Sequence, residues 1–226
     1  MKPTSGIAKV LRFIGILFMA FTAVFTLLGG AGTTCAALMP TKWESMAPLA
    51  PYQWLYILYV IITIGIGVLG VRAVVLLIKG RANAYRSTLV ALTAGVVVGV
   101  IHIATSRALR GSSMPVDAVV YITILTLFIF LLFRIPGIWK GVDYSKAPKK
   151  ESKKSGGVAA IIVAFFVLTI QFWMASTHTW GGINFADAFN ATMTTCGGLL
   201  FVSGIVLLLP DHLLKRDVFE RVETIK

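Results

Sequence analysis

The chain has 226 residues, of which 57% are hydrophobic and only 13% are charged. An ordinary soluble domain has about 25% charged residues, so this composition excludes a water-soluble globular fold, which could not hide so much apolar surface. The net charge is +12, but the basic residues lie between apolar runs and form no basic face with interleaved aromatic residues. This placement favours anionic lipid head groups, and not nucleic acid, as the negatively charged partner.

Six apolar runs are each long enough to cross the roughly 30 Å hydrocarbon core of a bilayer as a helix. We therefore predict an all-α integral membrane protein, with six transmembrane helices forming one bundle over residues 1–210. We expect it to lie in a bacterial or archaeal plasma membrane. The predicted spans cover about residues 11–38, 52–78, 87–107, 115–134, 157–176 and 187–209.

The positions of Lys and Arg predict the orientation of these spans. Eighteen of the 21 basic residues fall on one side of the membrane, and only Lys42, Arg107 and Arg110 fall on the other. Because cytoplasmic loops carry an excess of Lys and Arg, we expect both termini in the cytoplasm. Aromatic residues at the expected outer interface agree with this orientation: Tyr52, Tyr56, Trp43, Trp54, Trp173 and Trp180.

Two polar segments lie on the predicted cytoplasmic side. The loop 135–156 contains the basic run 149–154, which is too polar to bury anything, so we expect it to be mobile and attracted to anionic lipid. The tail 211–226 has apolar residues at helical spacing, which predicts a short amphipathic helix along the inner interface. Its apolar face consists of Leu214, Val218, Val222 and Ile225.

The second span contains GIGVLG at residues 65–70, which matches the dinucleotide-binding pattern G-x-G-x-x-G. That pattern functions at a strand-to-helix turn, where free backbone N–H groups face a pyrophosphate. The N–H groups of a membrane helix are already bonded, so we interpret these glycines as a helix-packing contact. Gly95 and Gly99 in the third span form a similar small-residue motif.

Unusual polar residues gather in the predicted outer half of the membrane. Residues 29–35 of the first span and 194–198 of the last span carry similar residues in reverse order. Since antiparallel helices would bring these segments to similar depths, we expect a close crossing there. The resulting candidate polar cluster consists of Thr33, Thr34, Cys35, His102, His178, Thr194, Thr195 and Cys196.

Three functions are compatible with this cluster. The polar groups can join helices, which indicates a non-catalytic structural or accessory membrane protein with a homo-oligomeric or membrane-complex partner. Alternatively, a cavity between the first and last spans would serve a small-solute channel or transporter. A third interpretation is thiol redox or metal chemistry at Cys35 and Cys196, either as a disulfide or as ligands.

Nothing in the sequence specifies a reaction. It has no HExxH motif, no phosphate-binding loop and no pair of carboxylates within a span,. We therefore name no catalytic, cofactor-binding or metal-binding residue and assign no cofactor.

Overall fold

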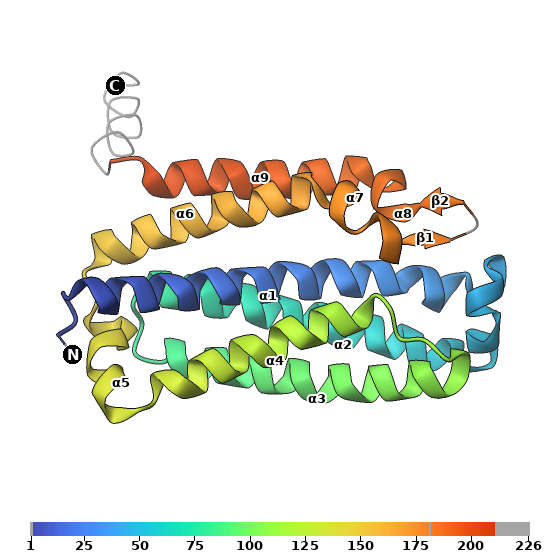
Figure 1. Ribbon diagram of the computed structural model, residues 1–226, viewed down its shortest axis with the longest axis horizontal. Helices are drawn as coiled ribbons and strands as arrows, with labels where there is room; N and C mark the ends of the chain where they lie inside the picture. The colour runs from blue at the N-terminus through green and yellow to red at the C-terminus, as the bar shows by residue number, and fades with distance from the viewer. Residues whose placement is uncertain (1, 181, 211–226) are drawn as a thin grey trace, which may run out of the picture.

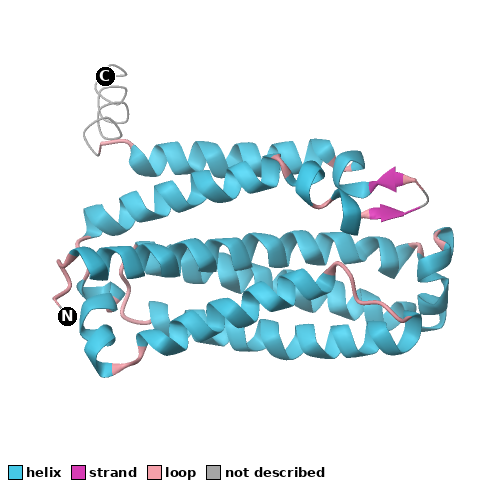
Figure 2. Cartoon of the chain, in the orientation of Figure 1, coloured by secondary structure: helices cyan, strands magenta, loops and turns pink. Residues whose placement is uncertain are grey.

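The computed structural model describes residues 2–180 and 182–210, and this part of the chain is almost entirely helical (Figure 1, Figure 2). Within it, six long helices run alternately between the two ends of the molecule (Figure 1). They are α1 (Gly6–Leu38), α2 (Gln53–Ile78), α3 (Ala84–Arg110), α4 (Val116–Phe133), α6 (Lys149–Leu168) and α9 (Asn190–Leu208).

Short elements connect the long helices at the two ends. The single described sheet is an antiparallel pair in which Thr179 lies opposite Asn184 and Trp180 opposite Ile183. The short elements are η1 (Pro40–Lys42), η2 (Glu44–Tyr52), α5 (Pro136–Val142), η3 (Tyr144–Lys146), α7 (Ile170–Trp173), η4 (Ala175–Thr177), β1 (Thr179–Trp180), β2 (Ile183–Asn184) and α8 (Phe185–Ala188).

Five helical segments of the described chain are long and apolar enough to cross a membrane. They are α1, the continuous segment Glu44–Ile78, α3, α4 and α9, and their mean hydropathies lie between 1.8 and 2.6. The chain is therefore a multi-pass helical membrane protein. Much of the apolar surface of these helices is exposed in the isolated chain, as is typical of helices that contact lipid,.

The predicted span 157–176 is not among these five segments. The helix in this region, α6, begins earlier, at Lys149, and ends at Leu168, so only residues 155–168 form its uncharged part. Just beyond the end of α6, the Trp173 indole N–H donates to the Phe166 carbonyl oxygen at 3.2 Å. That hydrogen bond gives the Phe166 carbonyl a donor close to Leu168, where α6 ends,.

The segment 135–156 is not the loop that the sequence predicts. It folds as α5, η3 and the first turns of α6, and Val142, Tyr144 and Ser152 are buried. The polar composition misled the prediction because a helix needs only one buried face, and Lys149, Lys150 and Lys154 are on the exposed face,. The predicted amphipathic helix over 211–226 lies outside the described residues.

Helix α1 contacts α2, α4, α5 and α6 and is the element around which the other helices pack. It has 33 residues, which corresponds to about 50 Å, well over the roughly 30 Å of the hydrocarbon core. Both α1 and α9 continue through their glycines without a break.

Two glycines place α2 directly against α1. A Cβ atom on Gly67 would lie 2.6 Å from Leu27 Cδ2, and one on Gly70 would lie 3.0 Å from the Cβ of Ala23. Gly65, in contrast, has no described atom other than its own helix backbone within 4 Å of its Cβ position. The helix-packing interpretation of the G-x-G-x-x-G pattern is therefore confirmed at Gly67 and Gly70.

We expect Gly67→Val to lower the stability of the protein by about 1–3 kcal/mol, because the added methyl groups overpack the α1–α2 contact. Gly65→Val is the matched control, with the same substitution two residues away in open space. Thermal unfolding in a mild detergent measures both. A Gly67→Val variant that unfolds at the same temperature as Gly65→Val would contradict the packing.

Candidate functional site

Three hydroxyl groups of the predicted polar cluster, those of Thr33, Thr194 and Thr195, are hydrogen bonded within their own helices. On α1, the Thr33 hydroxyl donates to the Gly29 carbonyl oxygen at 2.8 Å. On α9, the Thr194 hydroxyl donates to Asn190 Oδ1 at 3.0 Å and the Thr195 hydroxyl to the Ala191 carbonyl oxygen at 2.8 Å. Both α9 threonines are exposed, whereas Thr33, Thr34 and Cys35 on α1 are half-buried.

The predicted close crossing of residues 29–35 with 194–198 is wrong. The nearest atoms to a Cβ on Gly29 belong to Val119 of α4, and those to a Cβ on Gly30 belong to α2. On α9, a Cβ on Gly197 would lie 2.6 Å from Leu168 of α6. Helix α6 lies between α1 and α9 (Figure 1), so α9 packs its glycines against α6.

Cys35 and Cys196 are both free, half-buried thiols in the structure. Cys196 packs against the apolar cluster formed by Ala20 of α1 with Val163 and Val167 of α6. Within residues 2–180 and 182–210, no group of three His, Cys, Asp or Glu side chains is placed to hold a metal ion.

His102 is buried between α2 and α3 among tyrosines. Its ring stacks on Tyr59, with centroids 4.2 Å apart and an interplanar angle of 13°, and it meets the edge of Tyr56 at 5.5 Å. The Tyr56 hydroxyl is hydrogen bonded to Ser106 Oγ at 2.7 Å. Tyr56 is therefore an interior residue and not a member of the aromatic belt to which the sequence assigned it.

His178 lies in a different part of the molecule, in the turn between η4 and β1. Its Nδ1 is 3.1 Å from the Met174 carbonyl oxygen. Burial lowers the pKa of His178, although the contact with that carbonyl acts in the opposite direction. His102 and His178 therefore contact different elements and form no common site with the described cysteines.

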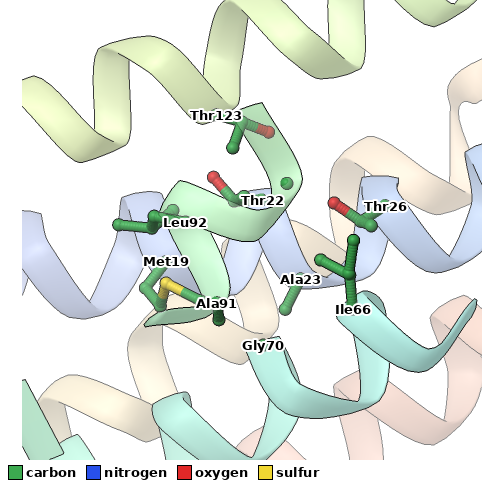
Figure 3. Close-up of a pocket in the computed structure, with 10 residues that line it drawn as sticks. Met19, Thr22, Ala23, Thr26, Ile66, Gly70, Ala91, Leu92 and Thr123 are labelled. Carbon is green, nitrogen blue, oxygen red and sulfur yellow. The ribbon is translucent and has the colours of Figure 1, made fainter. Parts of the chain in front are cut away.

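A small cavity lies inside the bundle where α1, α2, α3 and α4 meet (Figure 3). Thr22 and Thr26 of α1 and Thr123 of α4 point toward it, and its volume is about 10 Å³. That volume is close to the minimum needed for one water molecule. Beside it, the hydroxyls of Thr22 and Thr126 are hydrogen bonded to each other at 2.8 Å.

At one end of the bundle, the buried guanidinium of Arg12 connects three parts of the chain. Its side chain is only 3% exposed. It donates to the Gly141 carbonyl oxygen in α5 at 2.6 Å and forms an ion pair with Glu151 in α6. The Tyr144 hydroxyl in η3 donates to the Arg12 carbonyl oxygen at 3.3 Å.

Sequence reasoning missed this network because it counted Arg12 among the solvated cytoplasmic charges. A signal was present in the helical spacing, since Ala8, Gly15, Ile16 and Met19 lie on the same face of α1 as Arg12 and are buried with it,. An arginine on a face of small and apolar residues indicates a buried charge that requires a partner.

At the opposite end, Arg107 joins α3 to the beginning of α4. Its guanidinium lies 2.7 Å from Asp117 Oδ2 and donates to Ser113 Oγ at 2.8 Å. The second carboxylate oxygen of Asp117 is buried with no hydrogen-bond partner among the described residues. Asp117 thus has a structural role in holding two helices together.

A comparison of the chain with protein-family models, with curated proteins and with solved structures finds no match. The function must therefore be argued from the geometry of the chain itself.

We expect both cysteines to react with a maleimide polymer when the protein is dissolved in SDS without reductant, because both thiols are free. Gel electrophoresis should show two additions per chain, and the Cys196→Ala control should show one. Two additions that appear only after reduction would contradict the structure and restore the disulfide interpretation.

Proposed function

We propose that this chain is a non-catalytic structural or accessory protein of a membrane, and that it functions in a larger or oligomeric assembly. The observation that carries this proposal is that its interior polar groups bond one helix to another. The Thr22–Thr126 pair joins α1 to α4, and the Tyr56–Ser106 pair joins α2 to α3. Arg12 joins α1 to α5 and α6. Each of these groups holds helices together.

We further propose that the chain crosses the membrane six times, with both termini in the cytoplasm. The ion pair of Arg12 with Glu151 joins the beginning of α1 to the beginning of α6. Lys153 Nζ lies 3.3 Å from the Leu209 carbonyl oxygen, which joins α6 to the end of α9. The beginning of α1 and the end of α9 thus both lie against the beginning of α6, at the same end of the bundle, as an even number of crossings requires. The excess of Lys and Arg at that end supports a cytoplasmic location.

The assembly part of the proposal is supported by two glycines that contact no other helix in the described part of the chain. Apart from the backbone of their own helices, no described atom lies within 4 Å of the Cβ positions of Gly32 and Gly198. Gly198 lies on α9, whose outer face exposes Leu199 at 65% and Val202 at 58%. A small residue on an apolar membrane face lets a second helix approach closely.

A channel or transporter is the less well supported function. Sites for small molecules usually have volumes of about 300–1,000 Å³, whereas the interior cavity has a volume of about 10 Å³. Thr194 and Thr195, which would line a path between the first and last spans, are exposed and bonded within α9. These contacts favour a structural role.

Cysteine accessibility tests this proposal. In a Cys35→Ala, Cys196→Ala background, we expect Thr22→Cys and Thr123→Cys to resist a charged thiol reagent supplied to both faces of a proteoliposome, because the cavity has no room for it. Ser145→Cys, at an exposed position, is the reactive control. Rapid modification of both cavity variants would indicate a water-filled path and would favour transport.

Two single-cysteine variants in the same background, Ser145→Cys and Lys42→Cys, test the orientation. A reagent that cannot cross the membrane should modify Ser145→Cys from the cytoplasmic side only. Lys42→Cys, an exposed position on the opposite side of the predicted spans, should react only from outside. Modification of both variants from the same side would contradict the six crossings.

A further inference from the structure

A basic groove with a volume of about 170 Å³ lies at the end of the bundle where α3 begins and α4 ends. It is formed by the turn between α2 and α3, the first turn of α3, the end of α4, α5 and η3. The groove is lined mainly by arginine and aromatic residues: Arg81, Tyr85, Arg86, Arg134, Trp139 and Tyr144.

Arg134 is held in place by two aromatic rings. Its guanidinium carbon lies 4.7 Å from the ring centroid of Trp139 and 5.4 Å from that of Tyr85. The two rings contact each other edge to face, with centroids 4.8 Å apart. The Tyr85 hydroxyl donates to the Phe130 carbonyl oxygen at 2.8 Å, which fixes the ring on α4. A guanidinium positioned in this way loses little rotamer entropy when it binds a ligand.

The charge of the groove is not neutralised within the described chain. None of the described carboxylates lies within ion-pairing distance of Arg81, Arg86 or Arg134. The acidic residue of the groove, Asp143, is paired with Lys146 at 3.0 Å and accepts two hydrogen bonds from Ser145. Burial alone would raise the pKa of Asp143, but the bonds from Ser145 and Lys146 outweigh it and hold the pKa below its usual value.

We propose that this groove binds a phosphate-bearing anion. Arginine guanidinium groups bind phosphate oxygens through two parallel hydrogen bonds, and three of them line one small cavity,. The volume is below the 300–1,000 Å³ of sites for larger ligands, so it suits a phosphate group and not a whole cofactor. The phosphate is supplied either by an anionic lipid head group or by a soluble phosphate. The lipid source rests on the proposed cytoplasmic orientation, in which the groove lies at the level of the head groups.

Binding to the purified full-length protein in detergent tests this proposal. We expect phosphatidic acid, added in mixed micelles, to bind and phosphatidylcholine not to bind. Arg86→Gln and Arg134→Gln should each weaken phosphatidic acid binding by about tenfold, because each removes one charge-assisted contact. Lys150→Gln is the matched control, since it removes the same charge from an exposed lysine of the predicted cytoplasmic side but outside the groove.

A second series of titrations uses inorganic phosphate in place of the lipid and shows whether the bound phosphate comes from a lipid head group or from a soluble molecule. Phosphate binding that Arg86→Gln and Arg134→Gln weaken supports the site and adds a soluble ligand. Lipid binding that the two arginine variants weaken, without any binding of inorganic phosphate, supports the site with a lipid as its ligand. The proposal is overturned if neither ligand binds, or if Lys150→Gln weakens binding as much as the two arginine variants.

Thermal unfolding of each variant shows whether it is folded, and because Arg86 and Arg134 are both exposed, neither substitution opens a cavity in the core. The titrations contain no bilayer and measure no solute path. Their outcome is therefore independent of the accessibility measurements that test the structural function and the orientation.

Discussion

The buried guanidinium of Arg12 determines how one end of this protein is built. A charge without a partner inside a protein costs several kcal/mol, so a buried arginine requires hydrogen-bond acceptors around it. Here the acceptors are the Gly141 carbonyl and the Glu151 carboxylate, which come from parts of the chain more than 120 residues away. The burial of the beginning of α1 therefore depends on α5 and on the first turn of α6, which supply these acceptors. This requirement explains why the polar segment 135–156 is folded.

The Arg12 network and the proposed anion site lie at the same end of the molecule, and Tyr144 belongs to both. Its hydroxyl donates to the Arg12 carbonyl oxygen, and Tyr144 is also among the residues that line the groove with Arg134. The tyrosine fits there because Gly15 has no side chain, since a Cβ at that position would overlap the tyrosine hydroxyl. Gly80, with a φ of 59°, brings the α2–α3 turn against the Tyr144 carbonyl oxygen, where a Cβ would lie only 2.8 Å away. The left-handed conformation and the close approach both favour glycine at this position.

The sequence predicted the membrane class and most helices, because hydropathy over about 20 residues reflects the thickness of the bilayer. The predicted spans 87–107 and 115–134 correspond to α3 and α4. Residues 157–176 were harder to predict, because the run of apolar residues continues past Leu168 where the helix does not. The candidate site was predicted least well. Whether Thr194 bonds to a neighbouring helix or to Asn190 depends on helix rotation and pairing, which hydropathy does not encode. For the same reason, the partners of Arg12 could not be identified from composition.

This end of the fold requires Arg12 and Glu151 to act as a pair, and a double-mutant cycle measures the interaction between them. The free energy of unfolding in detergent is compared for Arg12→Met, Glu151→Gln and the double variant, with Lys9→Met as a control, because Lys9 lies 3.5 Å from Glu151 but is 51% exposed. We expect each substitution of the pair to destabilise the protein, and the coupling energy to be about 1–3 kcal/mol. The Lys9 variant should lose less than about 1 kcal/mol. Additive losses for Arg12 and Glu151, with no coupling energy, would show that the two residues do not stabilise this end of the fold as a pair.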